Sequence, residues 1–342
     1  MRRRTGASGL KMKEVRGIVI LGLFLMVSFM ALPSGVAWGN KRAAPPEILE
    51  DTIIIGDRVL DIAYRLGVMP KAMSIRGSVW DKAKGLKKCS QILGCPNYIV
   101  KNPSTVPDAC KKFGIRRIII EKSEPFCLYM PGASPLKVVP LLAGVDVAIE
   151  YVDMTKGMAS AIKQTAALLG CKDQKVQALL EKWDKQTVAI QKMLPKEVKK
   201  SGKKAVVFHG TFHRSSGKVG LRVEAPGFYA DTFFLSKLGY RNVGEVFNPS
   251  GKKPRKGHFQ VKKTKKGLDL SPLLQEDPDV IIATGDVFAV QKALRMYLLK
   301  HPKLAQVKAI RNMAVYALPA YVDSSPLDYA KALQKWIAAL EP

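Results

Sequence analysis

The sequence predicts an α/β protein with two doubly wound lobes, each with a mostly parallel sheet, bridged by a single long α-helix. Short β-branched runs alternate with amphipathic segments in both halves of the chain, which is typical of parallel sheets covered by helices. Between the halves, apolar residues recur every three to four positions over residues 176–190, with Lys and Glu between them. This spacing predicts one helix of roughly 20 residues, about 30 Å long. A length of 342 residues also suits two domains.

The first 39 residues are expected to be a secretory signal peptide. Six basic side chains flank or precede an uncharged apolar run, and Ala37, Trp38 and Gly39 follow it at the expected cleavage site. The uncharged stretch over residues 17–39 is long enough to cross a bilayer, so an uncleaved N-terminal anchor is the alternative. In both cases the rest of the chain is expected outside the cytoplasm.

The N-terminal lobe is expected over residues 40–153. A buried strand over 52–55 leads through a turn at Gly56 to a helix that ends at Gly67. Four further strands are expected within 71–81, 98–105, 116–123 and 146–153. A short helix is expected over 105–114, followed later by a proline-bearing loop over 123–135.

Two consecutive helices are expected in the connection, residues 154–200. Gly170 is expected to end the first helix and Asp173 to cap the second. The C-terminal lobe, residues 201–342, then repeats the alternation. Strands are expected over 203–210, 240–247, 278–285 and after 314, and helices over 228–239, 268–277, 286–302 and 326–342. A glycine-bearing loop is expected over 211–227 and a basic loop or hairpin over 248–267.

The charge is strongly positive. The chain has a formal net charge of +28, and residues 1–39 hold six basic and one acidic side chain, so the exported part keeps +23. This excess suggests an anionic ligand, an acidic partner or an anionic membrane surface, although a solvated lysine-rich surface would also explain it. No nucleic-acid motif is present, so no nucleic-acid partner is expected.

Cysteine usage leaves the redox state open. Outside the cytoplasm we expect disulfide bonding among Cys89, Cys95 and Cys110. Because five cysteines cannot all pair, at least one stays free, and all five reduced is the alternative. Cys127 and Cys171 are the other two.

Enzyme motifs are missing from the sequence. It contains no GxSxG nucleophile elbow, no Walker A loop, no HExxH helix and no GxGxxG after the first strand. We therefore do not expect an enzyme, and we expect no intrinsic cofactor.

Six segments carry a resemblance to a known family. They are IIIGDRVLDIAYRLG, then IEYVD with the helix to LLG, ADTFFLSKLGYRNV, EDPDVIIATG, AIRNMAVYALP and the closing amphipathic helix. In order and spacing over residues 52–342 they resemble the substrate-binding proteins of ABC importers for iron–siderophore complexes, haem and cobalamin. The resemblance implies a monomeric periplasmic protein that captures an anionic metal chelate in the cleft between its lobes and delivers it to an ABC permease and its ATPase.

The sequence departs from the family at the expected permease contact. Members carry Ser-x-Glu before the second-lobe PDVI strand, and here Pro272 and Leu273 follow Ser271. The docking glutamate is therefore absent there, and Glu121 or Glu124 is the candidate docking carboxylate of the first lobe.

Candidate ligand residues follow the strands of both lobes, because ligands of open α/β sheets bind beyond the carboxyl ends of the strands. Aromatic faces would cover the planar parts of a chelate, and arginines would bond to its anionic oxygens. The candidates are Arg76, Trp80, Tyr129, His209, His213, Arg214, Arg222, Asp286 and Tyr321.

The HGTFH segment suggests direct metal contact. His209 and His213, with Cys127 from the other lobe, form the candidate metal-ligand set. The alternative is that one histidine caps the strand and the other is exposed. His258 lies in a basic segment and is not expected to have a role.

Two other functions stay open. One is binding of a bare transition-metal ion or of an oxyanion such as molybdate. The other is a metal- or thiol-handling protein without a permease, which the missing docking glutamate and the additional cysteines suggest.

Overall fold

The structure is a computed structural model that describes residues 45–76, 90–195, 197–198, 201–265, 267–321 and 325–340. The expected signal peptide, Trp80 and Cys89 lie outside the described residues. Both sheets belong to one unit, residues 44–342. Across the described ranges, no helix combines the length and the apolar character needed to cross a membrane.

The first sheet is entirely parallel, with the order β3-β2-β1-β4-β5. The chain adds strands on one side of β1 and then returns to add β4 and β5 on the other side. Its central strand is buried on both faces, which explains the continuous apolar run of residues 53–55. The strands are β1 (Glu47–Ile55), β2 (Val68–Ser74), β3 (Gln91–Gly94), β4 (Arg117–Lys122) and β5 (Ala148–Asp153).

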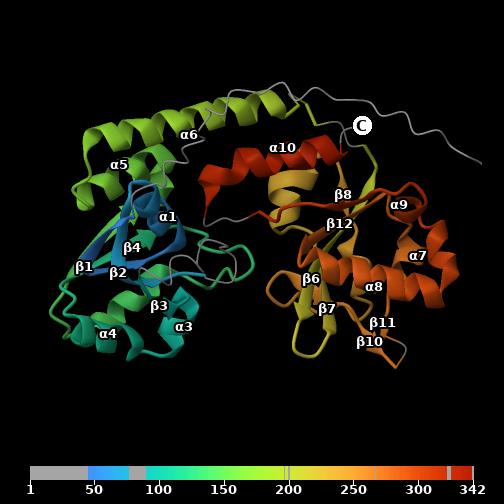
Figure 1. Ribbon diagram of the computed structural model, residues 1–342, viewed down its shortest axis with the longest axis horizontal. Helices are drawn as coiled ribbons and strands as arrows, with labels where there is room; N and C mark the ends of the chain where they lie inside the picture. The colour runs from blue at the N-terminus through green and yellow to red at the C-terminus, as the bar shows by residue number, and fades with distance from the viewer. Residues whose placement is uncertain are drawn as a thin grey trace, which may run out of the picture. The chain divides into compact units, whose positions relative to one another are not determined.

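Helices cover both faces of this sheet (Figure 1). Successive side chains of a strand point to opposite faces, so Ile54 packs with α1 (Asp57–Arg65) and α5 (Met158–Leu168), whereas Ile53 and Ile55 belong to the core on the other face. That second core contains α3 (Pro96–Lys101), α4 (Thr105–Phe113) and the 3-10 helix η1 (Pro135–Leu142).

The expected strand over 98–105 is wrong. Residues 96–101 form α3, because Pro96 stands in the first helical turn, where its missing N–H costs no hydrogen bond, and Ile99 is fully buried. The edge strand is β3, earlier in the chain.

The long helix α6 (Asp173–Met193) is continuous over 21 residues (Figure 1). Its first half contributes Val176 and Leu179 to a core of the first lobe, and its end contributes Ile190 and Met193 to a core of the second. One rigid element therefore contacts both halves. Asp173 is the first helical residue and makes no capping bond, so its expected role as the cap is wrong.

The second sheet has the order β13-β12-β6-β7-β9, with β8 beside β6. The strand β6 is parallel to β12 and β8 and antiparallel to β7. Its strands are β6 (Lys204–His213), β7 (Lys218–Glu224), β8 (Arg241–Asn242), β9 (His258–Gln260), β12 (Val280–Gly285) and β13 (Val315–Ala317).

The expectation of a loop over 211–227 is wrong for most of these residues. They form a β-hairpin, because β6 extends to His213 and pairs with β7. Leu221 and Val223 are buried and Arg222 between them is half-buried, which is the pattern of a half-buried strand. A second hairpin joins β10 (Lys263–Thr264) to β11 (Gly267–Leu268), and the strand expected over 240–247 is reduced to β8 and the 3-10 helix η5 (Gly244–Phe247).

Helices also cover both faces of the second sheet. One core contains residues of α7 (Pro272–Glu276), α8 (Val287–Lys300) and α9 (Lys308–Arg311), with Phe208 and Ile281. The other contains α10 (Tyr329–Leu340) and the π-helix η3 (Asp231–Leu235), where Trp336 stacks on Phe234 at 4.2 Å between ring centroids. The expected fold class is confirmed in both lobes.

Candidate ligand site

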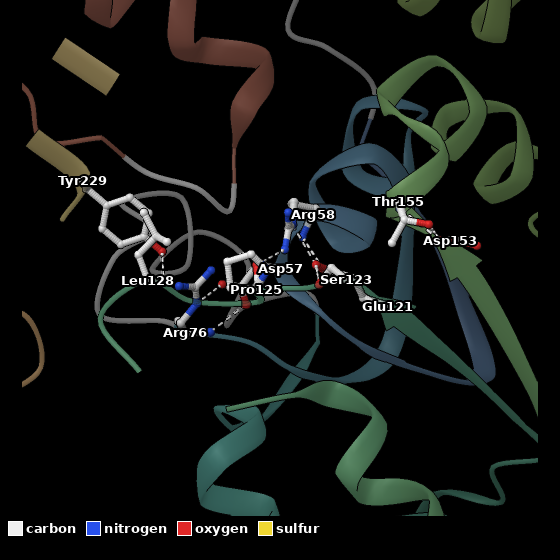
Figure 2. A network of polar contacts seen from close by, with 10 residues as sticks. All are labelled: Asp57, Arg58, Arg76, Glu121, Ser123, Pro125, Leu128, Asp153, Thr155 and Tyr229. Atoms are coloured by element: carbon white, nitrogen blue, oxygen red, sulfur yellow. Dashed lines mark hydrogen bonds and ion pairs between the residues drawn. The ribbon is translucent and has the colours of Figure 1, made fainter. Parts of the chain in front are cut away.

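Two ion pairs stand at the carboxyl edge of the first sheet, between β1 and β4 (Figure 2). Asp57 follows β1 and accepts bonds from Arg76 N at 2.9 Å and Arg76 Nε at 2.5 Å. Glu121, on β4, accepts from Arg58 Nε at 2.7 Å and from Ser123 Oγ at 2.8 Å. This is the position where the strand order reverses, at which open α/β sheets bind their ligands.

Gly56 makes this arrangement possible. Its φ is 138°, and a Cβ there would lie 2.2 Å from Glu121 Cβ. Only glycine lets β1 turn this close to β4. Burial raises the pKa of Asp57 to about 6, and the neighbouring Arg76 opposes that rise.

The predicted roles of Arg76 and Glu121 fit this geometry poorly. Arg76 is 6% exposed, pairs with Asp57 and stands 4.5 Å from the ring centroid of Phe126. Glu121 is fully buried against Arg58, so its carboxylate is not offered to a permease surface. Glu124 is exposed and stays the candidate docking residue. The paired arginines instead hold the loop after β4, since Arg58 also donates to the Pro125 carbonyl at 3.4 Å.

Tyr129, in the same loop, packs against residues of the second lobe. The backbone N–H of Leu128 donates to the Tyr229 hydroxyl at 2.9 Å (Figure 2). The ring of Tyr129 lies 4.6 Å from that of Tyr229 and 4.8 Å from that of His258, centroid to centroid. Gly257 lies against the same ring, and a Cβ there would come within 2.1 Å of Tyr129 Cδ1. A first-lobe aromatic side chain is therefore enclosed by second-lobe residues.

Around Tyr129, the pairing of β6, β7 and β9 assembles polar side chains. His209 on β6 is opposite Arg222 on β7, and Glu224 on β7 is opposite His258 on β9. The rings of His209 and His258 lie 5.8 Å apart. We call Tyr129, His209, Arg222, Glu224 and His258 the Tyr129 cluster.

Both histidines of the cluster are neutral at physiological pH. Burial and, to a smaller extent, the positive charge of Arg222 lower the pKa of His209 to about 4. Burial likewise lowers the pKa of His258 to about 4, with smaller effects from Arg222 and His209 in the same direction. Neutral imidazoles keep a nitrogen lone pair, so they can accept a hydrogen bond or coordinate a metal.

Glu224 is the titratable acid of the cluster. Burial raises its pKa to about 7, while hydrogen bonds from the Ala230 N–H and the Tyr129 hydroxyl oppose the rise. The Ala230 N–H lies 2.7 Å from Glu224 Oε1. The carboxyl group therefore changes charge near neutral pH and bonds a residue of the other lobe.

Of the predicted ligand residues, the structure brings together Tyr129, His209 and Arg222. His213 and Arg214 are exposed at the β6–β7 turn, and Asp286 accepts from the Ala289 N–H as the cap of α8. Tyr321 stacks on Phe233 at 3.6 Å. Trp80 lies outside the described residues.

His258 and Glu224 were not predicted as site residues. His258 lies in a basic segment, yet its side chain is buried at 5% exposure, beside His209. The alternation over residues 219–223 and the His258-Phe259 pair before Val261 were the available signals, since they mark the two strands that carry these side chains.

The candidate metal set is not assembled. Among the described residues, no group of three or more His, Cys, Asp or Glu side chains is arranged to hold a metal ion, although His209, His213 and Cys127 are all described. Cys95, Cys110, Cys127 and Cys171 are free thiols, so Cys95 and Cys110 do not pair with each other as the sequence suggested. Pairing with Cys89 lies outside the described residues.

A separate hollow of about 470 Å³ lies where β4 and β5 end. It is lined by Lys122, Leu136, Val139, Tyr151 and Asp153 and includes no member of the Tyr129 cluster. Asp153 accepts bonds from the N–H and hydroxyl of Thr155 (Figure 2). Because Lys122 and Tyr151 in its wall are exposed, this hollow is a weaker candidate than the Tyr129 cluster.

The two lobes, the bridging helix and a polar cluster at the strand ends define a solute-binding protein of the two-lobed α/β type. A family model described as periplasmic binding protein matches residues 143–322, more than half of the chain, and the chain belongs to this family. Membership indicates a location outside the cytoplasm. Comparison with curated protein sequences gives no match.

Solved structures extend the likeness to most of the chain. The periplasmic haem-binding protein BhuT, in complex with two haems, has a TM-score of 0.51 and 16% identity, covering 84% of this chain and 98% of its own. RhuT, the periplasmic haem-binding protein of Roseiflexus sp. RS-1, has a TM-score of 0.50 and 13% identity, covering 86% and 98%. At these identities the likeness shows the fold.

Proposed function

We propose that this protein is an extracytoplasmic solute-binding protein that captures a metal chelate between its lobes and delivers it to an ABC permease and its ATPase. The chelate is a ferric siderophore, a haem or a corrinoid. In this proposal residues 1–39 direct export, 40–153 and 201–342 are the binding lobes, and 154–200 connect them. Family membership and the haem-binding relatives BhuT and RhuT support it.

The Tyr129 cluster is the observation that carries the proposal. It joins a phenol from one lobe to two neutral imidazoles and a guanidinium from the other. The guanidinium suits carboxylate or chelate oxygens, and the aromatic rings suit a planar or apolar ligand surface. The proposed role of the Tyr129 cluster is to bind the chelate, and no chemical step is proposed for it.

A chelate fits this cluster better than a bare ion. A transition-metal ion held by protein alone needs about four ligands. The described residues offer no group of three, whereas a chelated metal brings most of its own ligands. A single imidazole such as that of His209 would then complete the coordination.

Thiol handling has less support. Burial raises the pKa of the Cys110 and Cys171 thiols, which lowers their thiolate fraction and hence their reactivity.

The test is calorimetric titration of the exported protein with haem, ferric siderophores, cobalamin, free Fe³⁺ and Zn²⁺, and molybdate. We expect saturation by one class of chelate. His209→Ala should weaken it by about tenfold to a hundredfold, the effect of losing a buried contact worth about 1–3 kcal/mol. His213→Ala is the control, because that side chain is exposed at the hairpin turn, and it should bind like the wild type. Saturation by a free ion or by molybdate alone would overturn the chelate proposal.

A further inference from the structure

The helix α8 exposes a second apolar face. Its buried side faces the core through Ala289, Val290 and Ala293. On the other side Phe288 is 54%, Met296 49% and Leu299 74% exposed. At about 100° per residue these three side chains lie within one sector of the helix. Large apolar groups gathered on the outside of a helix indicate a surface that contacts something apolar.

Cations share that face. Lys292 and Arg295 fall in the same sector, four and seven residues after Phe288. Lys292 Nζ lies 5.3 Å from the ring centroid of Phe212 and 5.9 Å from that of Phe288, and the two rings meet edge to face at 5.1 Å. Phe212 belongs to β6, so the β6–β7 hairpin continues this face.

Two basic hairpins flank α8. The helix contacts β7 and β11, and Figure 1 shows it beside the β6–β7 and β10–β11 hairpins. Residues 211–223 contain no Asp or Glu, and residues 248–268 contain eight Lys or Arg and no Asp or Glu. The exposed cations of the two turns form no salt bridge within the described residues; they are Arg214, Lys218, Lys262, Lys263 and Lys265.

We propose that this α8 surface, made of the outer face of α8 and the two flanking hairpins, binds an anionic membrane. Phe288, Met296 and Leu299 enter the boundary between headgroups and acyl chains, and the lysines of the hairpins contact anionic headgroups. A helix with apolar side chains bordered by lysine is typical of interfacial binding. Lysine is depleted in protein–protein interfaces, which argues against an acidic protein as the partner.

Such binding would keep the protein at the membrane surface, where its search for a permease is confined to two dimensions. None of the side chains proposed to contact lipid belongs to the Tyr129 cluster, although the β6–β7 hairpin also carries His209, Arg222 and Glu224. The inference therefore stands or fails independently of the proposed ligand.

The test is co-sedimentation with lipid vesicles. The chain from residue 40 onward keeps every described element and lacks the apolar N-terminal run, which would bind vesicles itself. At 50 mM salt we expect binding to vesicles of phosphatidylcholine with one-third phosphatidylglycerol to exceed binding to pure phosphatidylcholine by about tenfold or more. Binding should fall steeply at 500 mM salt, because headgroup attraction is screened.

Three variants separate the contribution of the apolar side chains of α8 from that of the hairpin lysines. Phe288→Ser/Leu299→Ser should weaken binding by about tenfold, and Lys262→Glu/Lys263→Glu/Lys265→Glu should abolish it. The matched control Lys182→Glu/Lys185→Glu/Val188→Ser changes exposed residues of α6 in the same way and should bind like the wild type. Circular dichroism checks that each variant is folded.

Equal loss in the α6 control, or unchanged binding by the Phe288/Leu299 variant, would overturn the proposal. Binding to polyglutamate with none to the vesicles would also overturn it and would assign the surface to an acidic protein.

Discussion

Glu224 couples the pH to the stability of the second lobe. Burial raises its pKa from the ordinary 4.5 to about 7. As the pH rises, the unfolded chain loses this proton first, so the free energy of unfolding falls between about pH 4.5 and pH 7 and stays lower above that range. The two pKa values correspond to a loss on the order of 3 kcal/mol.

Glu224→Gln should remove this loss. The amide stays neutral and its oxygen still accepts from the Ala230 N–H. We therefore expect the free energy of unfolding of the variant, relative to wild type, to increase by about 2–3 kcal/mol between pH 5 and pH 8. Urea unfolding at the two pH values measures it. Glu181→Gln is the control, because Glu181 is exposed on α6. Its free energy of unfolding should differ from that of the wild type by the same amount at both pH values. If the difference in free energy of unfolding between Glu224→Gln and wild type does not change with pH, the raised pKa of Glu224 is contradicted.

At the scale of elements, Gly210 sets the distance between β6 and α8. A Cβ on Gly210 would lie 2.1 Å from the Asp286 carbonyl oxygen and 3.0 Å from Val290 Cγ2. The backbone at the start of α8 cannot give way as a flexible side chain could, so the strand and the helix would have to separate.

Gly210→Ala should therefore lower the free energy of unfolding by about 1–3 kcal/mol, the usual cost of overpacking. Gly220→Ala on the paired strand β7 is the control, because the nearest atoms to a Cβ there are 3.9 Å away. We expect it to change stability by less than about 0.5 kcal/mol. Equal effects of the two substitutions in urea unfolding would show that the close approach does not limit this packing.

At the scale of the whole molecule, Arg65 ties the C-terminal segment to the first lobe. From α1 it donates to Asp61 at 2.8 Å, to Asp328 at 2.9 Å and to Ser325 Oγ at 3.0 Å. Ser325 in turn donates to Asp61 at 3.0 Å. Arg65 thus bonds residues more than 250 positions away in the chain, and this link adds to the contacts that Tyr129 makes with the second lobe.

Arg65→Met should cost about 3 kcal/mol, because the Asp61 carboxylate, 1% exposed, loses its guanidinium partner inside the protein. Amide hydrogen exchange should become faster in α10 and in the last turn of α1. Arg116→Met is the control: Arg116 is 82% exposed and its pair with Asp51 is at the surface, so the expected change is below about 0.5 kcal/mol. Unchanged exchange in α10 would show that Arg65 does not hold this segment.

Part of the candidate site could be predicted from the sequence. Tyr129 and His209 were found because each lies on or after a segment with a clear strand or loop pattern, whereas Arg222 was assigned to a loop and lies on β7. Glu224 and His258 were missed, because their meeting depends on the pairing of β7 with β9 across more than 30 residues, and no local pattern encodes which strands pair.

The sequence by itself determined the two α/β halves and the helix between them, because hydrophobic periodicity is a local property of each segment. Only the tertiary structure decided which charged side chains are available. Arg76 and Glu121 are alike in sequence to exposed ligand residues, yet ion pairs with Asp57 and Arg58 at the start of α1 neutralise both. Burial and long-range pairing also set the charge state of His209 and Glu224, which depends on desolvation by residues far away in the chain.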